Sequence, residues 1–198
     1  LAGVTPAPDA SAGTSSLPPA SDCEPETVEL ALDEPLGDAL RQAAAAHAVT
    51  LSALTQALWA VVLGVRNGHR RDVVFGVVTS GRPAEVDGID RAVGLFIRTL
   101  PLRARWNEAD GIASLLADLR EQGLGQMRHG YMPLAAMGRD LLDHLMVFEN
   151  YPADTPLDGT GLRLLDVRGY EKIPYPLGIT VIPGAELHFR FLYDPAVL

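Results

Sequence analysis

The chain has 198 residues, a formal net charge of −9 at pH 7 and a hydrophobic content of 47%. A chain of this size can bury a core without disulfides, and its acidic balance excludes a typical nucleic-acid binder, because phosphate binding needs surplus Lys and Arg. The single cysteine, Cys23, permits no internal disulfide, and no apolar run reaches the length of a membrane span, so we expect a cytoplasmic protein without a membrane partner.

Residues 1–25 are rich in Pro, Ala, Ser and Gly and contain almost no large apolar side chains, which predicts a linker. We expect the folded domain to span residues 26–198. The sequence begins at Leu1, and we expect it to be a fragment of a longer protein. In residues 27–32, Val28, Leu30 and Leu32 alternate with smaller or polar residues, which predicts a strand.

Two helices are predicted next. The first covers residues 34–48 and contains a run of alanines, the residue with the highest helix propensity. Thr50 is a suitable N-cap for a second helix that begins at Leu51 and ends at Asn67–Gly68. This second helix is apolar over most of its surface, so we expect it to be deeply buried.

The remaining pattern completes an α/β layer architecture. Residues 72–78 form a continuous apolar run, typical of a strand that is buried on both faces. Periodicity predicts an amphipathic helix over residues 110–128 and further strands over residues 95–106, 144–152, 161–171, 175–182 and 185–194. We therefore expect a mixed sheet of about six or seven strands flanked by three main helices.

No complete catalytic motif is present. The sequence lacks HExxH, CxxC, GxSxG and the GxxxxGK[ST] phosphate loop. We interpret the five histidines mainly as surface or packing residues, with His129 the strongest functional candidate among them. The carboxylates of Glu85, Asp87 and Asp90 form either a metal or acid/base cluster or, as we favour, solvated turn residues, and Asp90 is also a possible helix cap.

Polar residues gather in the connection SGRPAEVDGIDRAVGLFIRTLP, residues 80–101. Arg82 follows a Ser-Gly turn, where a guanidinium either pins the loop by bonding backbone carbonyls or binds an anion. We favour the structural pin. Gly94, which precedes Leu95 and Phe96, indicates a close backbone approach to another element or to a ligand.

Several motifs together carry a family resemblance. LSALTQALWAVVLG, DVVFGVVTSGRPAEVDGID, VGLFIRTLPLR, HGYMPL and VFENYP, followed by YPLGITVIPGAELHFRFLYDPAVL, resemble in order and spacing the C-terminal lobe of a nonribosomal peptide synthetase condensation domain. Each motif is weak alone, and five in register are specific. The resemblance covers the chain from about Val28 to Leu198, and it implies a chloramphenicol acetyltransferase-like fold, in which two α/β sandwich lobes enclose a tunnel.

The resemblance also implies an activity. Such domains join aminoacyl or peptidyl thioesters through an amide bond, and donor and acceptor carrier proteins deliver these substrates on 4'-phosphopantetheine. The family's HHxxxDG motif belongs to the N-terminal lobe and is absent here. The resemblance therefore implies a chain that holds no catalytic residue or cofactor of its own and is inactive without the N-terminal lobe. The alternative is a non-catalytic condensation-like domain that recruits or docks partner proteins.

The resemblance places several residues at the tunnel or the lobe interface. These are Ser80, Gly81, Arg82, Gly94, Phe96, Arg98, Thr99, His129, Pro133, Glu149, Asn150 and Tyr151. Arg98 stands where the family motif usually has Asn, so it could recognise a carboxylate, fill the tunnel or mark a specialised or inactive member. Gly130 stands where the family usually has Gln. The amino acids joined, the donor stereochemistry and the antibiotic or siderophore product stay open.

Overall fold

The computed structural model describes residues 23–82, 86–89, 91–107, 109, 111–130, 142–149 and 174–198. The elements follow in the order β1 (Glu26–Leu32), α1 (Glu34–Ala46), α2 (Leu51–Arg66), β2 (Asp72–Thr79), β3 (Arg98–Arg105), α3 (Gly111–His129), β4 (His144–Phe148), β5 (Leu177–Ile182) and β6 (Leu187–Tyr193). The strand predicted over residues 161–171 and most of the predicted linker lie outside the described residues.

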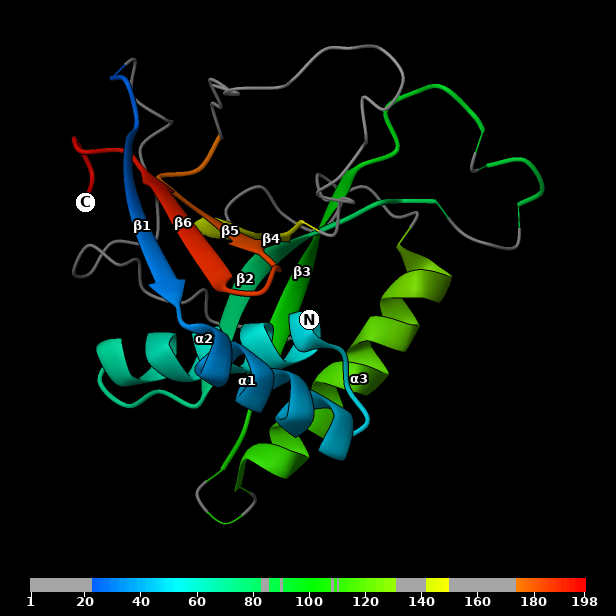
Figure 1. The fold of residues 1–198 in the computed structure, drawn as a ribbon. Coiled ribbons are helices and arrows are strands. Elements are labelled where there is room, and N and C mark those ends of the chain that lie inside the picture. The colour runs from blue at the N-terminus through cyan, green and yellow to red at the C-terminus, as the bar shows by residue number, and fades with distance from the viewer. Residues whose placement is uncertain are drawn as a thin grey trace.

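The described strands form one sheet in the order β1-β6-β5-β4-β2-β3. β4 is parallel to both β2 and β5, whereas the other neighbouring pairs are antiparallel. The three helices pack on one face of this sheet (Figure 1). The predicted mixed sheet flanked by three main helices is confirmed.

The core lies between the sheet and the helices. β2 is buried over most of its length, as its continuous apolar sequence predicts. The helix-facing residues of the sheet and the inner faces of the helices form one cluster, whose most buried members are Ala57, Ala60, Val73, Phe75, Leu102, Ala104, Leu115, Leu116, Ile179, Val181 and Leu187. Full burial of each large side chain contributes about 1.5–3 kcal/mol, so this cluster is the main source of stability.

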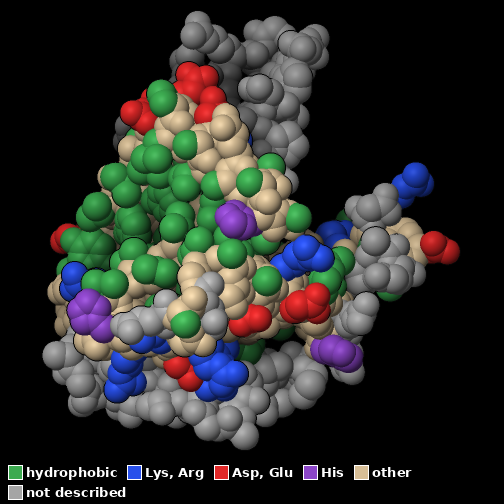
Figure 2. Space-filling model, turned by 90° about the horizontal axis from the view of Figure 1, so that it is seen from below, with side chains coloured by type: hydrophobic (Ala, Val, Ile, Leu, Met, Phe, Trp, Pro, Cys, Tyr) green, Lys and Arg blue, Asp and Glu red, His purple; other side chains and the backbone are tan. Residues whose placement is uncertain are grey.

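α2 is less buried than its composition predicts. Leu54, Ala57 and Ala60 pack into the core, whereas Leu58 and Val62 are more than one-third exposed. Hydrophobic side chains gather on the helix side of the molecule in Figure 2. The prediction of deep burial was wrong for one side of this helix, because the sheet contacts only the opposite side.

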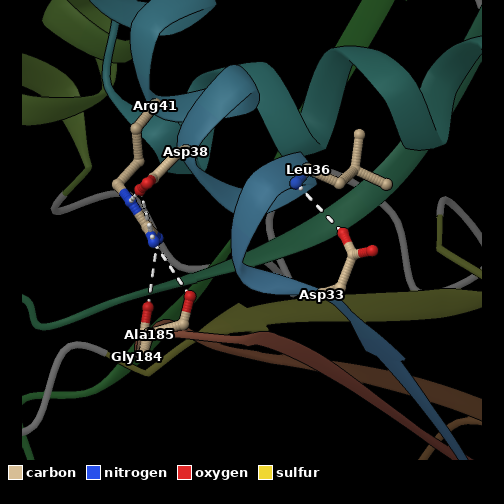
Figure 3. Close-up of polar contacts among 6 residues, drawn as sticks. All are labelled: Asp33, Leu36, Asp38, Arg41, Gly184 and Ala185. Atoms are coloured by element: carbon tan, nitrogen blue, oxygen red, sulfur yellow. Dashed lines mark hydrogen bonds and ion pairs between the residues drawn. The ribbon is translucent and has the colours of Figure 1, made fainter.

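Specific polar contacts fix the ends of the helices. The Thr50 hydroxyl accepts a hydrogen bond from the Ala53 backbone N–H (3.1 Å), which confirms the predicted N-cap of α2. Asp33 caps α1 in the same way (Figure 3). Arg41 of α1 donates to the carbonyl oxygens of Gly184 and Ala185 at 3.1 and 3.0 Å, and these bonds tie α1 to the turn between β5 and β6 (Figure 3).

α3 covers the outer edge of β3 through glutamine side chains. Gln122 accepts from the backbone N–H of Arg103 and donates to its carbonyl oxygen at 2.7 Å, and Gln126 donates to the Pro101 carbonyl oxygen at 3.1 Å. Four helix residues advance about 6 Å and two strand residues about 6.6 Å, so the two periods match. These side chains satisfy backbone groups that an edge strand otherwise leaves open.

The described helices show no single segment that is long and apolar enough to cross a membrane. α1 and α2 taken together have the length and apolar composition of a span, but the two helices are bent by 103° relative to each other.

Candidate functional site

The connection between β2 and β3 leaves the sheet after Thr79 and returns at Arg98, its pairing partner. Gly81 is the residue that makes the close return possible. Its φ is +61°, a left-handed value that favours glycine, and a Cβ atom there would lie 1.8 Å from the Phe96 carbonyl oxygen. The two ends of the connection therefore touch backbone to backbone just beyond the last strand pair.

Arg82 pins this connection from inside. Its guanidinium donates to the carbonyl oxygen of Ile89 and, at 3.0 Å, to that of Ala92. It also lies 4.4 Å from the centre of the Phe96 ring, within the range of a cation–π contact. The predicted structural pin, in which the guanidinium bonds backbone carbonyls of its own loop, is confirmed.

The expected close approach at Gly94 has a local cause. The nearest atoms to a Cβ built on Gly94 belong to the ring of Phe96, at 3.3 Å. Among the described residues, the close approach at Gly94 is therefore to the ring of Phe96, two residues along the chain, and not to another element.

The strand predicted to start at Leu95 starts at Arg98 instead. β2 ends at Thr79, which lies opposite Arg98, so residues 95–97 have no residues of β2 to pair with. This leaves an alternating apolar segment in water. Val93 and Leu95 are 102% and 91% exposed, and Ile97 is 57% exposed.

Arg98 joins the start of β3 to the end of α3. Its Nη1 donates to the Gly130 carbonyl oxygen at 2.9 Å, where a cation also interacts favourably with the helix dipole. Gly130 fits this corner because a Cβ there would lie 2.5 Å from the Gln126 carbonyl oxygen and 3.1 Å from Leu100. The two departures from the family pattern, Arg98 and Gly130, thus contact each other directly, beside His129.

The strand order brings Glu149 to the same end of the sheet. β2 and β4 run parallel, with Gly76 opposite Leu145, so Ser80 and Glu149 follow their strands at the same edge. The Glu149 backbone N–H donates to the Val181 carbonyl oxygen at 2.9 Å, which extends the pairing of β4 with β5. The structure therefore gathers most of the predicted site segments at one end of the sheet, and Pro133, Asn150 and Tyr151 lie outside the described residues.

In the described part of the chain, no group of three or more His, Cys, Asp and Glu side chains is arranged to hold a metal ion. Asp87 is exposed, which fits a solvated turn residue, and Glu85 and Asp90 lie outside the described residues.

A bidentate ion pair lies at the opposite end of β2. Arg103 contacts both carboxylate oxygens of Asp72, at 2.8 and 2.6 Å. The hydrogen bonds from Arg103 lower the pKa of Asp72 below its usual value. Because this pair joins β2 to β3 away from Ser80, we assign it to stability rather than to the site.

Comparison with known proteins identifies the family. Residues 8–197 match the family model of the condensation domain. The chain is 34% identical over 186 residues to gramicidin S synthase 2 of Brevibacillus brevis, and the match covers 88% of this chain and 4% of that protein. It is 37% identical over 174 residues to bacitracin synthase 3 of Bacillus licheniformis, a match that covers 82% of this chain and 3% of that protein. The chain thus spans only a small part of the length of these relatives.

Solved structures share the fold. The condensation domain from the monacolin K polyketide synthase MokA matches with a TM-score of 0.75 and 17% identity, over 98% of this chain and 49% of that chain. The first condensation domain of the CDA synthetase matches with a TM-score of 0.71 and 19% identity, over 88% of this chain and 41% of that chain. The fold class expected from the resemblance is confirmed, and the chain spans less than half of each of these structures. On the family match and this shared fold, the chain belongs to the condensation domain family.

Proposed function

We propose that this chain is the C-terminal lobe of a condensation domain that forms amide bonds in nonribosomal peptide synthesis, and that it acts only together with an N-terminal lobe. The family match and the similarity to gramicidin S synthase 2 support the activity. The chain's coverage of only 41–49% of two solved condensation-domain structures supports its assignment to one lobe.

The exposed apolar segment between Val93 and Ile97 carries the proposal. Arg82 and Gly81 hold the base of this loop in a defined conformation, yet Val93 and Leu95 are almost fully open to water. Large apolar side chains presented on a braced loop are typical of a surface that binds another protein. We assign this surface to the contact with the N-terminal lobe, and residues 26–198 to the C-terminal lobe that presents it.

In the proposed reaction, the amine of the acceptor attacks the donor thioester carbonyl. The new C–N bond forms, the C–S bond breaks, and the donor's phosphopantetheine leaves as a thiol. The general base or electrostatic group for this step belongs to the HHxxxDG motif, outside this chain. This chain contributes Ser80, Phe96 and Arg98 to the wall of the substrate tunnel. It binds no cofactor directly, because the phosphopantetheine is attached to the carrier proteins. The reaction takes place in the cytoplasm.

The test is an amide-formation assay with aminoacyl thioesters on donor and acceptor carrier proteins. The chain alone should form no product, and the chain mixed with an HHxxxDG-bearing lobe should form it. Leu95→Asp should lower product formation in the mixture, whereas Val65→Asp, at an exposed position of α2, should not. Amide formation by the chain alone would sink the proposal.

The non-catalytic alternative rests on Arg98, which replaces the usual Asn. Its bond to Gly130 gives it a structural task that does not depend on substrate. If the mixed lobes bind each other but form no amide, and Arg98→Asn does not restore activity, the chain is a docking domain.

A further inference from the structure

A half-buried cluster away from the proposed site joins the side chains of Trp59, Asp143 and His144, of which His144 is buried. Trp59 of α2 and His144 at the start of β4 lie 2.8 Å apart through Nε1 and Nε2, and His144 Nδ1 lies 2.5 Å from the Asp143 carboxylate. His144 is only 3% exposed. Its ring stacks on Phe75 at 5.6 Å and meets the Trp59 ring edge-on at 5.7 Å.

The hydrogen-bonding capacity of the neighbours determines where the His144 proton lies. An indole N–H is only a donor, so His144 Nε2 must accept and carries no proton. A carboxylate is an acceptor, so Nδ1 carries the proton and donates it to Asp143. We infer that His144 is held as the neutral Nδ1–H tautomer and is a positioning residue that clamps the start of β4 to α2.

The clamp acts on a short central strand. β4 covers only His144–Phe148 and lies between β2 and β5. Its pairing with β2 consists of Gly76 opposite Leu145 and Val77 opposite Met146. β4 is a stiff five-residue strand about 17 Å long. The anchor at His144 therefore also sets the position of Glu149, which directly follows the other end of the strand.

The functional importance of the Glu149 position rests on the proposed function, whereas the His144 tautomer does not. A condensation assay that fails in the native protein bears on the proposed function alone. Nitrogen chemical shifts of the imidazole bear on the clamp alone, so failure of one is distinguishable from failure of the other.

The first test is ¹⁵N NMR of the histidine rings in the unmodified 198-residue chain at neutral pH. We expect the His144 Nδ1 resonance of a protonated nitrogen and the Nε2 resonance of an unprotonated one, together with slow solvent exchange of the Trp59 indole proton. A protonated Nε2, with or without a protonated Nδ1, overturns the assignment, and this measurement needs no variant.

Two variants separate the bonds. His144→Gln places an amide near the Nε2 position and keeps an acceptor for Trp59, whereas His144→Asn keeps a donor for Asp143 only. We expect the Trp59 indole proton to exchange about tenfold faster in the Asn variant, the change expected for one lost hydrogen bond, and the Glu149 amide to lose protection with it. His144→Gln should retain both.

His188→Gln is the matched control, because His188 lies exposed on β6. It should leave the Trp59 and Glu149 protons unchanged. Equal indole exchange in His144→Gln and His144→Asn overturns the clamp. If both variants fail to fold, the tautomer of the unmodified chain decides.

Discussion

Replacement of Gly81 by alanine tests the construction of the β2–β3 loop. Gly81 and Gly88 both lie in this connection with positive φ, at +61° and +74°. A Cβ at Gly88 would meet nothing within 4 Å, whereas a Cβ at Gly81 would lie 1.8 Å from the Phe96 carbonyl oxygen. The pair Gly81→Ala and Gly88→Ala therefore separates the cost of the backbone conformation from the cost of the contact.

The magnitudes follow from these environments. Alanine in the left-handed region costs about 1–2 kcal/mol, and both variants carry this cost. A carbon–oxygen contact relaxes only at about 3.3 Å, so Phe96 must move by roughly 1.5 Å in Gly81→Ala. That shift moves the Phe96 ring away from the Arg82 guanidinium and loses a cation–π contact worth about 0.5–1 kcal/mol. We expect a total loss of about 2–3 kcal/mol in loop stability, against about 1–2 kcal/mol for Gly88→Ala.

Amide hydrogen exchange at Arg98 and Leu100 is the assay, because these residues pair with Thr79 and Val77 at the base of the loop. Their N–H groups point toward β2, on the side where the Trp106 N–H bonds Arg71, whereas the Arg103 N–H points to α3. Gly81→Ala should speed their exchange by roughly a hundredfold. Gly88→Ala should leave them nearly unchanged, because its cost falls within the loop and not at its base. Equal exchange in the two variants would refute the argument that the backbone contact at Phe96 requires glycine.

Three further predictions concern stability. Thr50→Ala removes the α2 cap and should lower the free energy of unfolding by about 1 kcal/mol in urea denaturation; Ser at the same position should restore it. Gln122→Ala should cost about 1–3 kcal/mol, since it leaves the Arg103 backbone groups unpaired, and Glu121→Ala on the same helix should not. The pKa of Asp72 is lowered in the folded state, so the ionised carboxylate stabilises the fold. This stabilisation is fully present above the unfolded pKa of about 4, and it is lost as the pH falls through the folded pKa. Unfolding of the native chain and of Asp72→Asn should therefore converge at acidic pH, and because the pair is partly exposed the gap at neutral pH should stay below about 1 kcal/mol.

Local patterns predicted most of the elements. Alternation gave β1 and β6, the continuous apolar run gave β2, and Thr50 marked the start of α2. The role of Arg82 also followed from local context, because a guanidinium beside a Ser-Gly turn has backbone carbonyls within reach.

Features that depend on distant partners could not be predicted in the same way. β3 begins at Arg98 because β2 ends at Thr79, and no signal within residues 95–97 records that end. The exposed side of α2 depends on which neighbours reach it. The hydrogen bond between Arg98 and Gly130 joins residues that lie 32 positions apart, and local periodicity does not relate them. Both residues depart from the family pattern, and this shared departure could have indicated that they are in contact. His144 looked like an ordinary packing histidine, and its partner Trp59 lies on another element.

We propose that the segment from Val93 to Ile97 is the surface through which this chain joins an N-terminal lobe. Hydrogen exchange of the chain, with and without an HHxxxDG-bearing lobe, tests this most directly. We predict that amides of residues 93–97, which precede β3 and are not paired with β2, gain protection when the lobe is added. Leu95→Asp should abolish the gain. If the lobe binds and these amides exchange as fast as before, the claim is contradicted.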